Sequence, residues 1–205
     1  MALGFHDESV MTAVRGAVFV GNPNQLIDKA LLPNITVDSE SFGTGAALFE
    51  NLGHMSEDNL PESNLDGGDA TVLGTWANPS FRTRYDQTTG TFTLHAVQSD
   101  RDLFKLVYNG VDDAASGGVD FSITKKATNK SLFLLWADTD TNERAGMLLP
   151  NVDITFDALP TLNQDSFNQI DISVTVKTSS ALNKNADGSA NYVRKYFQDA
   201  FKTAA

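Results

Sequence analysis

The chain has 205 residues, 41% of them hydrophobic, and a formal net charge of −11. This length fits one domain, residues 1–205, with a sizeable core, and no apolar run is long enough to span a membrane. The absence of cysteine excludes disulfides, thiol nucleophiles and cysteine metal sites, and the first eight residues lack the features of a signal peptide. The acidic balance argues against a protein that holds nucleic-acid phosphates.

The first 46 residues contain one clear strand between two segments without a regular pattern. Ala13–Val20 places valines on one face and predicts a strand, which ends at the turn signal Gly21–Asn24. Residues 1–12 are expected to form an N-terminal arm, and residues 21–46 a long loop. Because neither segment has a pattern that buries it within one domain, we expect both to be mobile in the free chain.

The long loop is too apolar for an ordinary surface loop. Two interpretations stay open: a floppy surface insertion, or an arm that becomes ordered on a partner because its side chains are unfavourable in water. The candidate assembly residues under the second interpretation are Leu26, Ile27, Leu31, Leu32, Ile35 and Val37.

A predicted strand, Ala47–Leu52, leads into an acidic block without Lys or Arg between Glu50 and Asp69. The carboxylates of this block are Glu50, Glu57, Asp58, Glu62, Asp66 and Asp69. A solvated acidic face is the plainer interpretation. Any two of them could be posed as the acid pair of a glycosidase, but no apolar cleft pattern distinguishes one carboxylate from another.

The middle of the chain predicts three strands and one short helix. Thr71–Trp76 and Ser80–Tyr85 predict short strands, and Thr91–Val97 alternates in the manner of a half-buried strand. Ser99 is expected to cap an amphipathic helix, which Gly110 ends. The core side chains predicted from these elements and from a later strand are Phe92, Leu94, Leu106, Ile172 and Val174.

The rest of the chain again predicts mainly strands. Ser131–Ala137 is nearly all apolar, as in a strand buried on both faces, and Ile170–Val176 alternates cleanly. A strand that begins at Arg144 is expected to be interrupted by Pro150. Residues 189–205 have apolar side chains at helical spacing and predict an amphipathic C-terminal helix.

No catalytic, metal or cofactor residue is predicted. Asp138–Asn142 copies the first ligands of a calcium loop, but Glu143 and Leu149 stand where such loops have glycine and glutamate. A hairpin turn over Asp138–Glu143 is the better interpretation. The three histidines are scattered without metal-ligand spacing, and no nucleotide-binding or nucleophile-elbow motif occurs.

The order of several local segments is distinctive. Leu52–Ser63 (LGHMSEDNLPES) is followed by Trp76, by the pair Arg82 and Arg84, and by Thr91–Leu94 leading into Leu103–Gly110. In this order the chain resembles, from Ala13 to Val176, the major tail tube proteins of long-tailed bacteriophages with non-contractile tails. Asn59 stands where that family often has glycine, and residues 21–46 are not part of the resemblance.

The resemblance implies a mainly β fold, a β-sandwich or barrel with one flanking helix. It also implies a structural protein of the virion that is not an enzyme, found in the phage tail and assembled in the host cytoplasm. Its subunits would form homohexameric rings, stacked into a hollow tube that conducts DNA without binding it specifically. Tape measure, tail tip and tail terminator proteins are the expected partners, and no membrane and no cofactor is expected.

Under this interpretation part of the negative charge would line the channel and keep DNA mobile. The candidate lumen residues are Glu50, Glu57, Asp58, Glu62, Asp66, Asp69, Asp112 and Asp113. The alternative function is a carbohydrate- or receptor-binding β-sandwich, in which Trp76, Trp136 and Tyr85 could stack on sugars, although Trp136 belongs to the most buried-looking strand.

Overall fold

The computed structural model describes residues 10–202, and one antiparallel sheet dominates it. The strands follow the order β2-β3-β1-β10-β11-β12-β7-β4, and β13 pairs with β11. Their bounds are β1 Arg15–Gly21, β2 Ser41–Phe42, β3 Phe49–Asn51, β4 Glu62–Asp66, β7 Thr89–Ala96, β10 Thr128–Ala137, β11 Arg144–Phe156, β12 Ile170–Val176 and β13 Arg194–Tyr196. The predicted mainly β fold is confirmed, and the antiparallel arrangement is consistent with the expected sandwich type.

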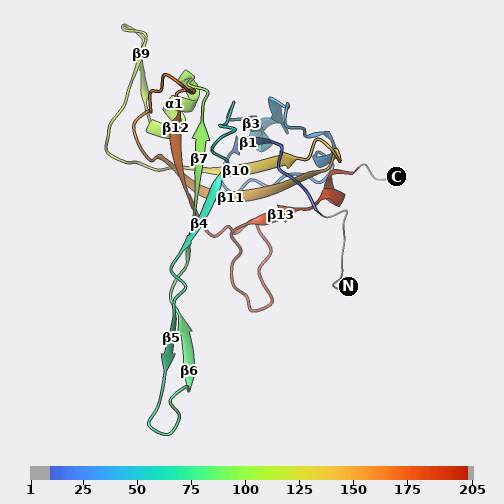
Figure 1. Ribbon diagram of the computed structural model, residues 1–205, viewed down its shortest axis with the longest axis vertical. Helices are drawn as coiled ribbons and strands as arrows, with labels where there is room; N and C mark the ends of the chain where they lie inside the picture. The colour runs from blue at the N-terminus through green and yellow to red at the C-terminus, as the bar shows by residue number, and fades with distance from the viewer. Residues whose placement is uncertain (1–9, 203–205) are drawn as a thin grey trace.

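Four further strands form two hairpins outside this sheet. They are β5 Ala70–Leu73 with β6 Arg82–Tyr85, and β8 Val111–Asp113 with β9 Gly118–Asp120. The helical elements are α1 Arg101–Tyr108 and the short 3-10 turns η2 Leu32–Asn34, η3 Gly45–Ala47 and η4 Gln198–Phe201. In Figure 1, β10 and β11 run across the body while β7 and β12 run almost at right angles to them, as expected from the twist of a long sheet.

The hairpin of β10 and β11 is buried on both faces, as its apolar sequence predicts. The predicted turn over Asp138–Glu143 is confirmed, with Asp138 N–H donating to the Glu143 carbonyl at 3.0 Å. The expected interruption at Pro150 is wrong, because β11 continues through it. The pairing register shifts between Lys130 and Leu132, opposite Pro150, so a bulge accommodates the missing proline N–H.

One core lies between a sheet face and α1. Leu94, Ile172 and Val174 are buried in it, while Phe92 and Leu106 pack against it half-buried, so the predicted faces are correct. The residues predicted to end the helix each differ by one position from those in the structure. Asp100, not Ser99, caps α1 by accepting a hydrogen bond from Leu103 N–H at 2.8 Å. Asn109, not Gly110, adopts the left-handed conformation at the other end, with φ of 53°.

A second core occupies the opposite face of β1, β10 and β11. It contains Ile27, Leu32 and Ile35 from the long loop, and Leu26, Leu31 and Val37 pack against it half-buried. The Arg144 guanidinium holds this segment by donating to the carbonyls of Pro33 and Ile35. The expectation that no part of the domain buries these side chains is therefore wrong, because they fill the sheet face that α1 does not cover.

The predicted C-terminal helix is also wrong. Residues 194–196 form β13, which pairs with the edge of β11 at Gly146–Leu148, and the 3-10 turn η4 follows. Tyr196 packs edge-to-face on Phe133 with ring centres 6.0 Å apart, and Phe201 is buried in the second core. Tertiary packing thus overrides a local helical pattern. Most of the predicted N-terminal arm lies outside the described residues, but Thr12 N–H donates to Asp138 Oδ2 at 2.9 Å.

We expect Ile35→Ala to lower the free energy of unfolding by about 2–5 kcal/mol, because it opens a cavity in the second core. Ile123→Ala is the matched control, since Ile123 is 76% exposed, and should change stability by less than about 0.5 kcal/mol. Urea unfolding of both variants measures the difference. Equal, small changes would mean that residues 25–37 are not packed in the free subunit.

Candidate assembly surface

The most unusual feature of the surface is a long two-stranded hairpin that leaves the body. It begins as the pair β4–β7, with Glu62 opposite Thr93, and continues as β5–β6, with Leu73 opposite Arg82 at its far end. Figure 1 shows this hairpin extending far beyond the rest of the chain. Every residue of β5 and β6 is exposed, so the outer half of the hairpin, residues 70–85, has no cover within residues 10–202.

Two glycines allow the strand to pass from the body into the outer hairpin. Gly67 and Gly68 have φ of +84° and +81°, a conformation that side chains with a Cβ rarely adopt. A Cβ at Gly67 would also clash with the carbonyl oxygen of Gln87, in the segment between β6 and β7. The two glycines therefore form the junction between the two halves of the hairpin. Strand pairing resumes beyond them at Ala70 and Tyr85.

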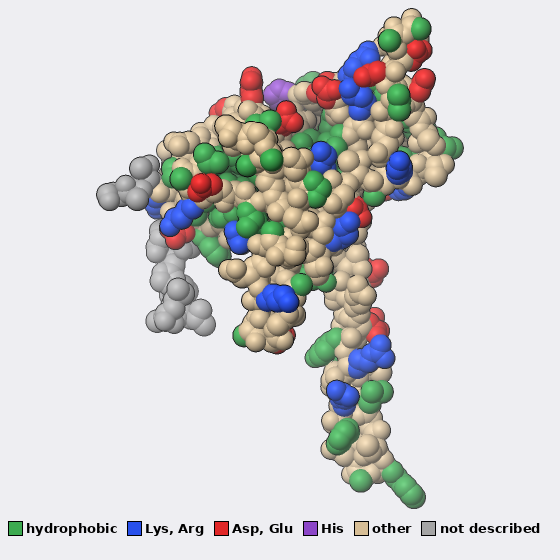
Figure 2. All heavy atoms as spheres, turned by 180° about the vertical axis from the view of Figure 1, so that it is seen from behind, with side chains coloured by type: hydrophobic (Ala, Val, Ile, Leu, Met, Phe, Trp, Pro, Cys, Tyr) green, Lys and Arg blue, Asp and Glu red, His purple; other side chains and the backbone are tan. Residues whose placement is uncertain are grey.

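The outer hairpin has an apolar face and a basic face. Side chains alternate along a strand, so Val72 and Tyr85 share one face and Arg82 and Arg84 share the other. Trp76 at the tip is fully exposed. Residues 70–85 contain these two arginines and no carboxylate, although the whole chain is strongly acidic. Figure 2 shows the basic and hydrophobic side chains along the hairpin and acidic ones near its base.

A two-stranded hairpin on its own is at best marginally stable in water. Exposed apolar side chains gathered in one element are typical of surfaces that bind another protein. The outer hairpin is accordingly our candidate assembly surface, and sequence reasoning missed it. The signal was available, because Ser80–Tyr85 alternates aromatic residues with arginines, but nothing local indicated that the element would stand free of the body.

The predicted assembly residues lie elsewhere, in the second core. Ile27, Leu32 and Ile35 are buried and cannot contact another molecule while the subunit is folded. Leu26, Leu31 and Val37 are half-buried. A contact between this segment and another subunit stays a prediction, to which only the half-buried side chains could contribute.

The acidic block is exposed, and most of it surrounds the base of the hairpin. Glu62 and Asp66 lie on β4, Asp69 joins β4 to β5, and Glu57 and Asp58 precede β4. Glu50 lies on β3. Within residues 10–202 none of these six carboxylates forms an ion pair, so their charge stays available to a partner or to a channel; their role stays a prediction.

The other two candidate lumen residues differ from this block. Asp112 forms ion pairs with Arg101 and Lys105, at 2.8 and 3.1 Å, and these hydrogen bonds lower its pKa. Hydrogen bonds from Ser116 and from the backbone of the β8–β9 turn lower the pKa of Asp113. The charge of Asp112 is thus balanced by two cations, and that of Asp113 is held by local hydrogen bonds within the small hairpin of β8 and β9.

One polar cluster could suggest acid–base chemistry. His95 Nδ1 lies 2.8 Å from Asp171 Oδ1, and Gln169 Nε2 lies 2.6 Å from the same carboxylate oxygen. The cluster joins β7 to β12 at the register pair His95–Asp171 and is half-buried. Within residues 10–202 the His95 ring contacts the side chains of Asp171 and Gln169, neither of which is a nucleophile adjacent to a base, and the cluster links β7 to β12.

The structure holds no arrangement suited to a metal within residues 10–202. Asp138 is buried and accepts hydrogen bonds from the N–H groups of Thr12, Asp140 and Thr141, which lower its pKa. Those donors occupy the carboxylate that a calcium ion would need. Among the described helices, none has the length and apolar character of a membrane span.

A mainly β chain with an exposed apolar and basic hairpin has a surface typical of proteins that bind other proteins. Comparison with known families makes this specific. Residues 3–191 match the model of a family described as phage tail tube protein, so the chain belongs to that family and is a structural component of the phage tail. The family resemblance seen in the sequence is confirmed.

Two curated relatives agree with this assignment. The major tail protein Gp23 of Mycobacterium phage L5 and that of Mycobacterium phage D29 are each 35% identical to the chain over 78 residues. The match covers 38% of this chain and 39% of each relative. The aligned region is thus about two-fifths of either relative.

The Asp171 carboxylate should make stability depend on acid. Burial opposes its ionisation, but hydrogen bonds from Gln169 and His95 outweigh burial, so its folded pKa lies below its usual value. A depressed folded pKa stabilises the subunit above the unfolded pKa of about 3.9, and the effect is lost as pH falls through the folded pKa. Asp171→Asn should therefore destabilise at pH 7 and converge on the parent protein in strong acid.

Thermal unfolding between pH 2 and 7 measures this difference. Asp120→Asn is the control, because Asp120 is exposed on β9 and its side chain forms no ion pair within residues 10–202. A stability gap for Asp171→Asn that stays constant down to pH 2 would mean that the carboxylate's charge contributes nothing.

Proposed function

We propose that the chain is the self-assembling subunit of the tail tube, forming homohexameric rings that stack into the conduit for DNA ejection. The observation that carries this proposal is the outer hairpin, residues 70–85, whose apolar side chains have no cover in the isolated subunit. A second copy of the same chain is always available to cover it. A contact between two different surfaces of identical subunits is heterologous, so it generates closed rings or open filaments.

Family membership and charge support a conduit. A channel must let DNA pass, whereas basic side chains that hold phosphates release counterions and bind tightly. The carboxylates between Glu50 and Asp69 are exposed and form no ion pair within residues 10–202, which suits a wall that repels the duplex. Repulsion from such a wall is screened over about 8 Å at physiological salt. The proposed role is structural and involves no catalysis. The proposed partners are the tape measure protein inside the tube and the tail tip and tail terminator proteins at its ends.

The alternative of a sugar-binding sandwich receives little support from the arrangement of the aromatic residues. Trp76 lies at the hairpin tip, whereas Trp136 lies on β10 beneath Lys195, whose Nζ is 3.5 Å from the ring centre. The two tryptophans therefore do not form one stacking platform. Burial lowers the pKa of Lys195, which is consistent with an internal packing role for this pair.

Removing the outer hairpin should abolish assembly and spare the fold. We would replace residues 67–88 by Asn-Gly, because Asp66 and Thr89 are opposite each other and a two-residue turn can join them. The matched control replaces residues 114–117, between the paired Asp113 and Gly118, by the same turn. Denaturant unfolding should show folded subunits in both cases. Electron microscopy and sedimentation should show rings or tubes only for the control, and tubes from the truncated chain would contradict the proposal.

The channel wall is tested by reversing charge. Groups of two or three carboxylates between Glu50 and Asp69 are changed to Lys, and variants that still build tubes are incorporated into virions. Ejection should slow or stop part-way for groups that face the channel, because each lysine adds a phosphate contact. Asp165 and Asp187, exposed on loops outside the acidic block, are changed to Lys as the control. Normal ejection from every group, with the lysines shown to face the channel, would refute a repelling wall.

A further inference from the structure

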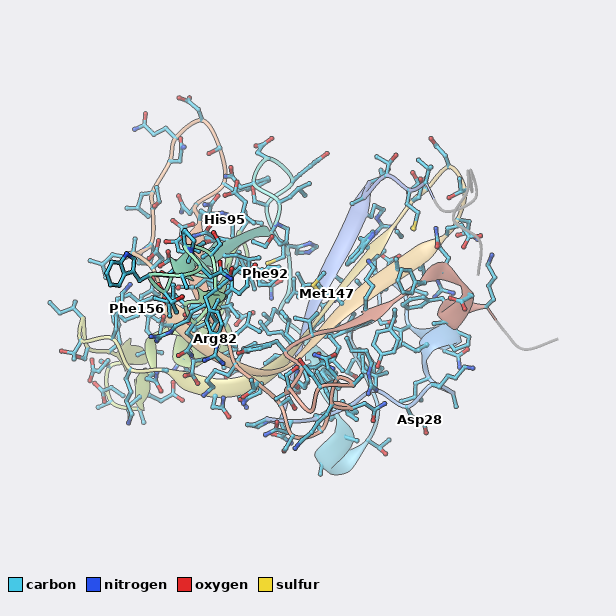
Figure 3. The ribbon with its side chains drawn as sticks, turned by 90° about the horizontal axis from the view of Figure 1, so that it is seen from below. Asp28, Arg82, Phe92, His95, Met147 and Phe156 are labelled. Atoms are coloured by element: carbon cyan, nitrogen blue, oxygen red, sulfur yellow. The ribbon has the colours of Figure 1, made fainter. Side chains whose placement is uncertain are left out.

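A groove of about 1050 Å³ lies beside the base of the hairpin, between β1 on one side and β4 and β7 on the other. Leu134, Trp136 and Met147 line it from β10 and β11, and Phe92 lines it from β7. Phe92 and Met147 are labelled in Figure 3. Its volume is at the upper limit of the roughly 300–1,000 Å³ typical of small-molecule sites. The size and the apolar lining suit a protein segment.

The groove is acidic at its rim. Asp38, Glu40 and Glu57 line it, together with Arg15 and His54. Arg15 is already bound to Asp38 at 2.5 Å, so these two charges offset each other. Glu40 and Glu57 are exposed and form no ion pair within residues 10–202. The groove therefore presents two unmatched negative charges beside an apolar lining.

One wall of the groove is a free sheet edge. Strand β1 pairs with β10 over its full length, but β3 covers its other edge only at Phe19–Gly21. The outer edge at Arg15–Ala17 thus has no strand neighbour in the described chain, although these residues line the groove. Such an edge is a template on which another segment can add backbone hydrogen bonds.

The outer hairpin has the complementary character. Val72 and Tyr85 supply an apolar face, Arg82 and Arg84 supply two positive charges without partners among residues 10–202, and both strands are extended. It cannot reach the groove of its own subunit. At about 3.3 Å per residue, the strand from Asp66 to the turn at Ala77 carries the tip roughly 35 Å from its base. That base adjoins the groove, because Ser63 and Phe92 belong to both.

We propose that the outer hairpin of one subunit docks in this groove of another copy of the chain, with Arg82 and Arg84 facing Glu40 and Glu57. This inference rests on the proposed self-assembly and names the two surfaces that meet. It is a head-to-tail contact, so each subunit offers one hairpin and one groove and the chain of contacts can continue. It also assigns Glu57 to a contact between subunits in place of the channel wall.

Cross-linking tests the contact directly, because the natural chain has no cysteine. Two variants are prepared separately, Thr83→Cys on the hairpin and Ser63→Cys in the groove. They are mixed, and a short bismaleimide is added after assembly. We expect a cross-linked dimer that contains one of each variant. Ala115→Cys, equally exposed on the turn of the β8–β9 hairpin, replaces Thr83→Cys as the control and should give none.

Charge reversal tests the pairing. Arg82→Glu with Arg84→Glu should raise the subunit concentration needed for assembly by about tenfold, since exposed ion pairs are individually weak. Adding Glu40→Arg and Glu57→Arg in the same chain should restore it. Lys126→Glu with Lys184→Glu, both on exposed loops, makes the same change in net charge and should have little effect.

Heterodimer cross-links together with charge-swap rescue support the docking. If tubes form without the cross-link, or if the swapped chain assembles no better than the Arg82→Glu, Arg84→Glu variant, the docking is overturned while the proposed self-assembly stands. If the unmodified chain never assembles, both are overturned.

Discussion

The structure depends on one constraint: the hairpin of β10 and β11 is apolar on both faces and must be covered twice. A sheet strand that faces water on neither side needs a layer above and a layer below. On one face α1 and the β7–β12 strands supply the first core. On the other face the segment around Leu32 and the C-terminal segment with Tyr196 and Phe201 form the second. The long loop is therefore part of the minimal folded unit.

This division explains why the hairpin can stand free. Both faces of the central strands are already covered, and the outer hairpin cannot reach the groove of its own subunit, so folding back would bury little apolar surface. The junction glycines Gly67 and Gly68 set the direction in which it leaves the body. Arg82 and Arg84, which form no ion pair within residues 10–202, favour its solubility in water. The free energy that the subunit does not gain from burying Val72 or Tyr85 on folding stays available for association.

Sequence reasoning succeeded where the apolar residues of a strand formed an uninterrupted pattern. The strands at Ser131–Ala137 and Ile170–Val176, the buried Leu94 and the turn after Ala137 were all predicted. It failed where distant contacts decide. Residues 189–205 have helical spacing, but the free edge of β11 recruits Arg194–Tyr196 as a strand. The same holds for Ile35, whose cover by Arg144 and Phe201 cannot be seen in local pattern. The assembly surface was missed because exposure is a property of the whole fold.

Positive and negative charges are concentrated on different parts of the subunit, which makes its surface polar from hairpin to body. An evenly acidic chain would repel its own copies at every orientation, and more strongly as salt falls. Here residues 70–85 carry positive charge alone, and the body carries the excess of carboxylates. In the proposed assembly, two subunits would repel when bodies face each other and attract when a hairpin meets a body, which would suppress symmetric dimers that end growth. Like-charge repulsion between bodies would then select the head-to-tail order that the proposed tube requires.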